Sequence, residues 1–163
     1  VAQALGVDEV RQKVGANATG MPFNSVAGIE RHPKGLTNPM VNSGAIAVTS
    51  LVPGETHDDK WKFIYEGFCR FAGHEVPLNE EVYVSASETN FRNQGIARVL
   101  QSYGAIYLDP AQAVDLYTRM CSLNVSARDL AQIGTVAQQL ATGALTPAAA
   151  RDILQRKQHG PQP

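Results

Sequence analysis

The chain has 163 residues, with 14 Lys and Arg against 15 Asp and Glu, a formal net charge of −1 and 44% hydrophobic residues. This length suits a single domain that buries about 70% of the surface its unfolded chain exposes, and the balanced charge excludes the basic surplus typical of nucleic-acid binders. No apolar run approaches the roughly 18 residues that a membrane-spanning helix requires, so we expect no membrane span.

The first expected elements are a loop and a buried helix. Two Gly, one Pro and two Asn within residues 15–25 predict an ordered loop. Asn38-Pro39 places a capping side chain ahead of a proline, and it predicts a helix from Met40 to Val52. Because this segment is apolar on nearly all sides, we expect the helix to be buried.

A second helix is expected from Thr56, which can serve as the N-cap, to Gly73, which supplies the stop. The run His57-Asp58-Asp59 has the residue types of a metal cluster, but we interpret it as the polar start of this helix. The apolar side chains recur at three- and four-residue steps, as in a helix with one buried face. They are Trp61, Ile64, Phe68, Phe71 and Ala72.

Two further helical segments are expected in the middle of the chain. Asn79 before Glu80-Glu81 predicts a short helical turn, and a longer helix is expected from about Thr89 to Tyr103. The β-prone runs 82–84 and 106–108 are too short to predict strands, so we interpret them as segments that flank turns.

Capping signals also mark the last helices. Asp109-Pro110 predicts a helix start with proline in the first turn, and Ser126 with Asp129 three residues later predicts a capping box. The helix after Ser126 is expected to end at Gly143. Thr146-Pro147 predicts a final helix, and residues 159–163 a disordered tail. The expected fold class is therefore mainly α, in one domain over residues 1–158.

Cysteine and histidine usage bears on the compartment and on metal binding. Cys69 and Cys121 are isolated in the sequence, so we interpret them as small buried hydrophobic residues rather than a disulfide or a metal site. No pair of histidines has the spacing of metal ligands. This usage favours a reducing compartment, and the cytoplasm is the expected location. We expect neither a metal nor a cofactor.

Motifs for nucleotide binding and for a nucleophile are absent from the 163 residues. The patterns G-x-x-x-x-G-K-[ST] and G-x-G-x-x-G do not occur, nor does the G-x-S-x-G elbow of serine hydrolases. None of the serines is followed three residues later by a lysine. No local Ser-Lys pair is encoded, and no residue is assigned as catalytic.

Three polar residues lie in apolar surroundings. Asn42 falls in the helix expected to be buried, Asn93 begins another apolar helix, and Tyr117 lies on an apolar stripe. The simpler interpretation is local: an amide bonded to backbone, a helix cap and a half-buried core tyrosine. The alternative is that the three side chains offer hydrogen-bond donors and acceptors to a polar ligand.

Several sequence blocks, taken in order, resemble the glutaminase family. These blocks are Val14-Gly15-Ala16, Thr19 to Ser25 (T-G-M-P-F-N-S), Asn38 to Ile46 (N-P-M-V-N-S-G-A-I), Phe91-Arg92-Asn93, Asp115 to Ser122 and Asp129-Leu130-Ala131. The resemblance covers about Val10 to Leu140, most of the chain. The family consists of serine-dependent, β-lactamase-like enzymes that hydrolyse L-glutamine to L-glutamate and ammonia.

The resemblance implies a fold, a reaction and a substrate site. The chain would be the helical middle portion of a serine β-lactamase-like and penicillin-binding-protein-like (DD-peptidase-like) α/β fold. In the intact family, a serine attacks the side-chain amide carbon of glutamine, and water then cleaves the acyl-enzyme. Asn42, Asn93 and Tyr117 fall on positions that contact the substrate L-glutamine. The resemblance also implies a homo-oligomer for the intact enzyme.

Two departures from the family pattern bear on activity. After the serine that corresponds to Ser85, the family has a glutamate that pairs with the substrate ammonium, and this chain has Ala86 there. Glu88 lies two positions further along, which on a helix is a rotation of about 200°. The family's upstream S-x-x-K and downstream S-G-V-G-G segments are missing. We therefore expect a catalytically incomplete chain that exposes surface normally covered by a sheet. The alternative is a non-catalytic module that binds glutamine or a partner.

Overall fold

The structure is a computed structural model, and it describes residues 1–143. Within that range the chain forms nine helices and no strand, and Leu78 and Leu123 form a single antiparallel bridge. The helices are α1 (Ala2–Leu5), α2 (Val7–Val14), α3 (Ala27–Glu30), α4 (Asn42–Ser50), α5 (His57–Ala72), α6 (Glu80–Thr89), α7 (Phe91–Ser102), α8 (Pro110–Cys121) and α9 (Ala127–Ala141). The expectation of a mainly α fold is confirmed.

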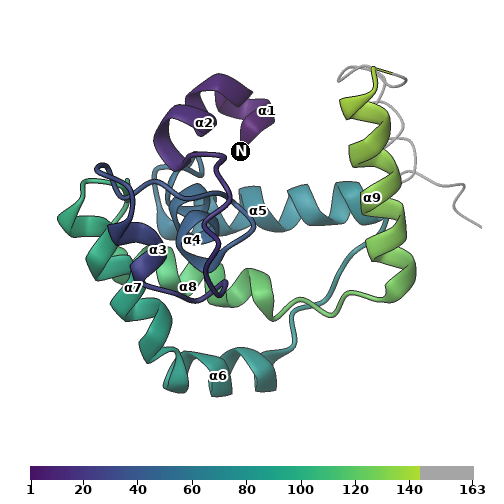
Figure 1. Cartoon of the computed structure of the whole chain (residues 1–163). Helices are drawn as coiled ribbons and strands as arrows, with labels where there is room; N and C mark the ends of the chain where they lie inside the picture. The colour runs from purple at the N-terminus through teal and green to yellow at the C-terminus, as the bar shows by residue number, and fades with distance from the viewer. Residues whose placement is uncertain (144–163) are drawn as a thin grey trace, which may run out of the picture.

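Helix α4 lies at the centre of the molecule, where it packs against α2, α7 and α8 (Figure 1). Its Ile46 and Ala47 are buried, as are Ile96 and Leu100 of α7 and Val114 of α8. These side chains belong to the largest hydrophobic cluster among the described residues. The nearly apolar segment is therefore buried, as its composition predicted.

Three helices extend away from this centre. Helix α5 runs from the middle of the molecule to α9, which stands at one side, and α6 lies apart from the other helices (Figure 1). Helix α9 packs against α5, and α6 packs against α8. No residue of α6 is buried.

The capping signals of three helices have the expected geometry. Thr56 and Asp59 form a reciprocal capping box at the start of α5, which ends at Gly73 in the left-handed conformation. Asp109 accepts hydrogen bonds from the first two free amides of α8. Ser126 and Asp129 form the reciprocal bonds of a capping box at the start of α9. Short polar side chains therefore satisfy amides that have no partner within the helix.

The expected start of the central helix was wrong. Asn38 does not cap α4; its Oδ1 accepts from Met40 N at 2.9 Å and closes a turn before the helix. The helix begins only at Asn42, because the Asn42 amide donates to Phe23 O at 2.8 Å instead of to a carbonyl four residues earlier. Asn42 is thus the first residue of a buried helix and is itself only half-buried.

The expectation for residues 79–103 was also partly wrong. The short turn after Asn79 is a helix of 10 residues, α6, which includes the run 82–84. The longer helix starts at Phe91, because Asn90 leaves the helical conformation between the two and donates through Nδ2 to Thr118 Oγ1 at 3.1 Å. A contact with α8 therefore sets the break at Asn90, close to the start expected for the longer helix.

Helices α1 and α2 were not predicted, although Val7, Val10 and Val14 recur at three- and four-residue steps. Cys69 is buried as expected, whereas Cys121 is exposed, so that part of the cysteine prediction was wrong. The final helix expected from Thr146 and the tail expected at 159–163 lie outside the described residues.

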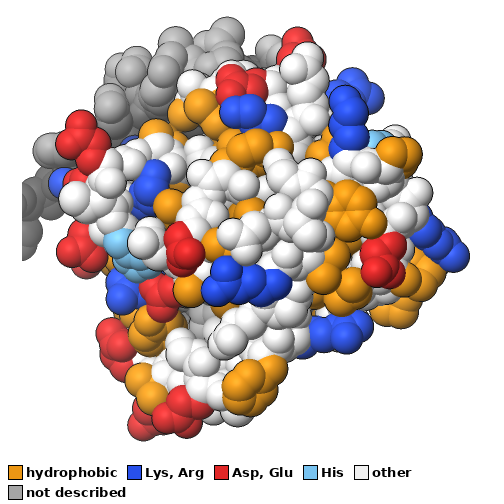
Figure 2. Space-filling model, turned by 90° about the vertical axis from the view of Figure 1, so that its left-hand side faces the viewer, with side chains coloured by type: hydrophobic (Ala, Val, Ile, Leu, Met, Phe, Trp, Pro, Cys, Tyr) orange, Lys and Arg blue, Asp and Glu red, His pale blue; other side chains and the backbone are white. Residues whose placement is uncertain are grey.

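The surface carries charges of both signs. Lysine and arginine side chains alternate with acidic ones on the face shown in Figure 2, and hydrophobic side chains lie between them. The described part of that face has no extended patch of one sign, the feature that attracts nucleic acids. Among residues 1–143, no helix combines the length and the hydrophobicity that crossing a bilayer requires.

Candidate functional site

A hydrogen bond joins two of the three residues predicted to contact a ligand. Asn42 begins α4 and Asn93 lies in the first turn of α7, and Asn42 Nδ2 donates to Asn93 Oδ1 at 3.0 Å. Among the described residues, Asn42 Oδ1 and Asn93 Nδ2 have no further partner. The pair therefore presents an acceptor and donors to a group that can both donate and accept, such as an amino-acid head group or a carboxamide.

A loop segment distant in sequence holds the backbone beside this pair. Phe23 O accepts from the amide of Asn42 at 2.8 Å, and Asn24 O accepts from Arg92 Nε at 3.0 Å. Arg92 immediately precedes Asn93. The P-F-N-S block, the start of α4 and the start of α7 therefore meet at one place in the fold.

Gly44 is required at the start of α4 because the preceding loop passes very close to the helix. A Cβ atom on Gly44 would lie 1.8 Å from Asn38 O and 2.3 Å from Asn38 C, distances that no side chain can tolerate. The loop is fixed by Asn38 Nδ2, which donates to Asn17 O at 2.8 Å, and by a buried hydroxyl pair, Thr37 and Ser43, at 3.0 Å. The N-P-x-x-N-x-G spacing is thus a steric requirement here.

Tyr117 lies on α8, the helix that packs against both α4 and α7. Its ring is half-buried against the central hydrophobic cluster. Burial raises the pKa of the Tyr117 phenol above its usual value, and the neighbouring Cys121 thiol adds to the shift. The hydroxyl therefore stays protonated at neutral pH. Within residues 1–143 it forms no hydrogen bond to Asn42 or Asn93, so the structure pairs the asparagines and places Tyr117 on an adjoining helix.

Ala86, at the position where the resemblance predicts a glutamate, lies on α6. Ala86 is half-buried there, whereas Glu88 is exposed, so the two residues lie on different sides of the helix. The rotation expected for a two-residue step along a helix agrees with this difference. Glu88 does not take the place of a carboxylate at position 86.

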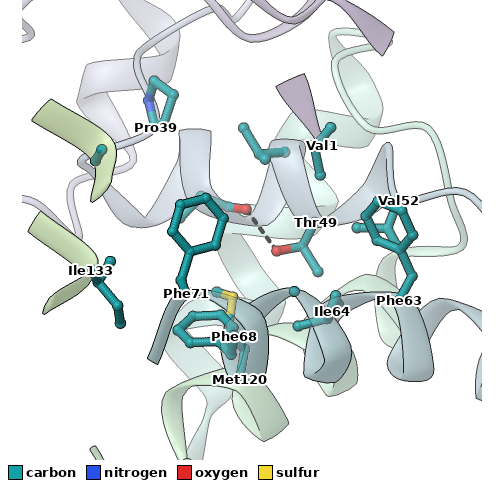
Figure 3. Close-up of a pocket in the computed structure, with 14 residues that line it drawn as sticks. Val1, Pro39, Thr49, Val52, Phe63, Ile64, Phe68, Phe71, Met120 and Ile133 are labelled. Atoms are coloured by element: carbon teal, nitrogen blue, oxygen red, sulfur yellow. Dashed lines mark hydrogen bonds between the residues drawn. The ribbon is translucent and has the colours of Figure 1, made fainter. Parts of the chain in front are cut away.

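A large groove lies elsewhere and has the opposite chemistry. A cavity of about 470 Å³ lies between α4, α5 and α9, and nonpolar atoms form almost all of its lining (Figure 3). Phe68 and Phe71 of α5 lie towards Ile133 of α9, and Ile64 lies farther along the groove beside Phe63 (Figure 3). Thr49 is among its few polar side chains, and its hydroxyl donates to a carbonyl of its own helix at 2.9 Å. None of the three predicted ligand residues lines this groove.

A polar cluster on α8 was missed by the sequence reasoning. Asp115 bonds to the Tyr83 hydroxyl of α6, to His57 Nε2 of α5 at 3.0 Å and to Arg119 Nε at 3.2 Å. The Arg119 guanidinium lies 5.2 Å from the centre of the Tyr83 ring and 5.8 Å from that of Trp61. This cluster joins three helices, and the spacing of Asp115 and Arg119 by four residues was the available signal.

A second missed contact fixes the start of α9. His74 Nε2 lies 2.6 Å from Asp129 Oδ1, and Asp129 also accepts from Ser126. The bond to Asp129 raises the pKa of the His74 imidazole. The same imidazole, together with Ser126, lowers the pKa of Asp129 to about 2. The contact spans 55 positions, so local sequence patterns contain no signal for it.

Known proteins resemble this chain over nearly its whole length. The family model described as Glutaminase matches residues 1–160. The protein "Glutaminase 2" of Yersinia pestis is 65% identical over 147 residues, which cover 90% of this chain and 42% of that protein. The chain thus spans less than half the length of this relative.

Solved structures agree with the sequence comparison. The probable glutaminase ybaS superposes with a TM-score of 0.81 at 36% identity, over 97% of this chain and 53% of its own. A structure of Mglu in its L-glutamate binding form superposes with a TM-score of 0.76 at 28% identity, over 93% of this chain and 36% of its own. These neighbours confirm the expected fold, the helical portion of a β-lactamase-like glutaminase. With a family model that covers almost all of its residues, the chain belongs to the glutaminase family.

Proposed function

We propose that this chain forms the substrate-binding helical part of an enzyme that hydrolyses L-glutamine to L-glutamate and ammonia. Asn42, Asn93 and Tyr117 are the proposed contacts to glutamine. The observation that supports this most is the bond from Asn42 Nδ2 to Asn93 Oδ1, which fixes two amides from different helices. Residues on helices provide a more rigid frame for a polar ligand than residues on loops.

The nucleophilic step is assigned to a Ser-Lys pair outside these 163 residues, because no serine here is followed by a lysine three positions later. In this proposal the serine attacks the side-chain amide carbon, ammonia leaves, and water cleaves the acyl-enzyme. The chain contributes the frame that orients glutamine. A correctly oriented substrate accounts for a large part of the rate of such reactions.

A second candidate is a glutamine-binding module without catalysis. Ala86 favours this candidate. It is half-buried on α6, and its side chain offers no carboxylate to the ammonium of a substrate. Losing a charge-assisted hydrogen bond costs about 1.5–3 kcal/mol. Both candidates require glutamine to bind at the asparagine pair, and they differ in whether a chain that includes the nucleophile releases ammonia.

Calorimetric titration of the chain with L-glutamine, L-glutamate and D-glutamine tests the shared part of both candidates. We expect saturable binding of L-glutamine that Asn42→Ala and Tyr117→Phe each weaken by about tenfold. Gln138→Ala on the exposed side of α9 is the control and should bind as the parent does. Equal binding by all four proteins would contradict the proposed site.

An ammonia assay separates the two candidates. We expect no steady ammonia release from the 163 residues alone. In a protein that also carries the Ser-Lys segment, release that depends on Asn42 supports the enzyme, whereas glutamine binding without release supports the module. Ammonia release from the 163-residue chain that Asn42→Ala abolishes would show that the nucleophile lies within it.

The compartment and assembly belong to the same proposal. We propose a cytoplasmic homo-oligomer. Two free cysteines, Cys69 and Cys121, suit a reducing compartment, and the family resemblance supports the assembly. Light scattering of the purified protein measures the assembly directly. A monomer at all accessible concentrations would contradict the oligomer.

A further inference from the structure

The asparagine pair is part of a closed ring of bonds. Starting from Asn42, its amide donates to Phe23 O; the next residue, Asn24, accepts at its carbonyl from Arg92 Nε. Arg92 precedes Asn93, whose Oδ1 accepts from Asn42 Nδ2. Three hydrogen bonds of 2.8, 3.0 and 3.0 Å and two peptide links therefore connect the P-F-N-S loop, α4 and α7.

Few hydrogen bonds join segment 22–25 to the two helices. The Phe23 side chain is 64% exposed, so it does not anchor the segment through packing. The bond from Ser25 N to Pro22 O, at 2.9 Å, shapes the segment but lies within it. Among the described residues, segment 22–25 is attached to α4 and α7 by hydrogen bonds only through Phe23 O and Asn24 O. Arg92 provides the second of these two attachments.

Arginine suits this role for a geometric reason. Its guanidinium is planar and permanently charged, and the direction of its Nε–H is fixed by the side chain. The acceptor, Asn24 O, is a backbone atom, so the bond constrains the path of the loop rather than a flexible side chain. A charged donor to a carbonyl is also stronger than a neutral one. Lysine has neither the planar shape nor a donor at that position.

We propose that Arg92 is a positioning residue for the glutamine site. By holding Asn24 O, it fixes the loop that binds the Asn42 backbone, and it thereby sets the direction in which the Asn42 and Asn93 amides face the ligand. The inference rests on the proposed function for the identity of the ligand. Its structural part, the coupling between Arg92 and the Asn42 amide, stands on the ring of bonds alone.

Arg92→Gln is the variant that tests the coupling, and Arg98→Gln is its matched control. Arg98 lies on the same helix and is also exposed, but its guanidinium bonds to Gln101 and takes no part in the ring. Hydrogen exchange followed by NMR reports on the Asn42 amide without any ligand. We expect exchange at Asn42 to rise about tenfold or more in Arg92→Gln and to stay unchanged in Arg98→Gln, with equal unfolding midpoints. Unchanged exchange at Asn42, or the same rise in both variants, would overturn the proposal.

Glutamine affinity tests the consequence for the ligand. We expect Arg92→Gln to bind glutamine about tenfold more weakly, Arg92→Lys to behave similarly, and low concentrations of guanidinium to restore part of the loss. A merely structural role would lower the unfolding midpoint and would not respond to guanidinium. L-Glutaminamide, which lacks the α-carboxylate, should lose the same factor as glutamine. A loss confined to glutamine would identify Arg92 as a direct ligand contact and overturn the positioning role.

The two proposals can fail separately. If the parent chain does not bind glutamine, the proposed function and the ligand part of this inference both fall. The exchange measurement on Arg92→Gln still decides whether the ring couples α7 to the start of α4.

Discussion

Helix α4 contributes to two regions of opposite character. At its start, Asn42 and Gly44 belong to a small polar site in which bonds between distant segments fix each amide. Further along, Val48 and Thr49 line a cavity of about 470 Å³ whose surface is almost entirely nonpolar, and Val52 lines it just after the helix ends. Hydrogen bonds fix the side chains of the polar site, whereas the groove offers hardly any directed contact.

Cavity size alone is a poor guide to the site of a polar ligand. An amino acid carries a carboxylate, an ammonium and a carboxamide, and each loses bonds to water unless the protein supplies a partner. Nonpolar grooves gain from excluding water but cannot orient such groups. Selectivity for glutamine is therefore expected where donors and acceptors converge, at the asparagine pair. The following predictions separate the two regions.

The largest expected effect comes from Gly44→Ala, which breaks the polar region. The new Cβ would lie 1.8 Å from Asn38 O, a backbone atom that cannot rotate away. We expect a loss of about 3 kcal/mol or more in the free energy of unfolding, because the loop must move off the helix. Urea denaturation measures the loss, and glutamine binding should disappear with it.

Gly134→Ala on α9 is the matched control for that substitution. A Cβ there meets nothing within 4 Å, and the residue lies inside a helix. We expect stabilisation by about 0.5–1 kcal/mol, since alanine restricts the unfolded chain more than glycine does. Similar losses for both variants would mean that the close approach at Gly44 is not the cause.

Asn93→Asp changes the hydrogen-bonding character of the site with almost no change in shape. An aspartate oxygen can still accept from Asn42 Nδ2, but the donors of Asn93 Nδ2 are lost and a negative charge is added. We expect glutamine affinity to fall by about tenfold to a hundredfold, which calorimetry measures. Ile64→Val in the groove should leave the affinity unchanged. An equal loss in both would contradict the separation of the two regions.

The groove should bind an apolar dye. We expect anilinonaphthalene sulfonate to fluoresce with the folded chain and Phe71→Asp, which places a charge in the nonpolar lining, to reduce the signal by about half or more. Phe91→Asp is the control, because Phe91 is 72% exposed and lies outside the groove. If both variants retain the full signal, the dye binds elsewhere.

The smallest expected effect is a pH dependence of the contact between His74 and Asp129, which attaches the α9 side of the groove. The raised pKa of His74 means that its contribution is complete below its ordinary value of 6.5 and is lost as the pH rises through the raised pKa. The lowered pKa of Asp129 means that its contribution is present above 3.8 and is lost as the pH falls towards 2. Stability from the pair is therefore greatest between pH 3.8 and 6.5.

Thermal unfolding near pH 5.5 and pH 8.5 checks this dependence. We expect a slightly higher midpoint at the lower pH and a smaller difference in His74→Gln. His32→Gln is the control, since the His32 imidazole accepts a bond from Lys34 N within its own turn. A difference that persists in His74→Gln would assign the effect to other groups.

Local patterns predicted those parts of the fold that depend on neighbouring residues. The caps at Thr56, Asp109 and Ser126 have the expected geometry, because a short polar side chain reaches amides two or three positions later whatever the tertiary structure. The apolar composition of 40–52 correctly predicted a buried helix, although the observed helix is the shorter Asn42–Ser50. Both signals depend only on residues within a few positions.

The predicted helix boundaries were wrong where a residue at the boundary forms a hydrogen bond to a segment distant in sequence. Asn38 caps a turn and not α4, because the Asn42 amide donates a hydrogen bond to Phe23 O. The break between α6 and α7 at Asn90 lies where its side chain bonds to Thr118 of α8. Neither partner is near in sequence, so no local pattern contains the information.

By itself, the sequence determined the helical fold, the family and the identity of the three candidate ligand residues. The spacing of caps and apolar residues depends on local geometry, and the ordered motifs depend on residue identity alone. Only the tertiary structure decided that Asn42 and Asn93 bond to each other, that Tyr117 lies on an adjoining helix, and that Arg92 closes the ring through Asn24 O. These contacts join residues 51 and 68 positions apart, and folding alone brings them within hydrogen-bond distance.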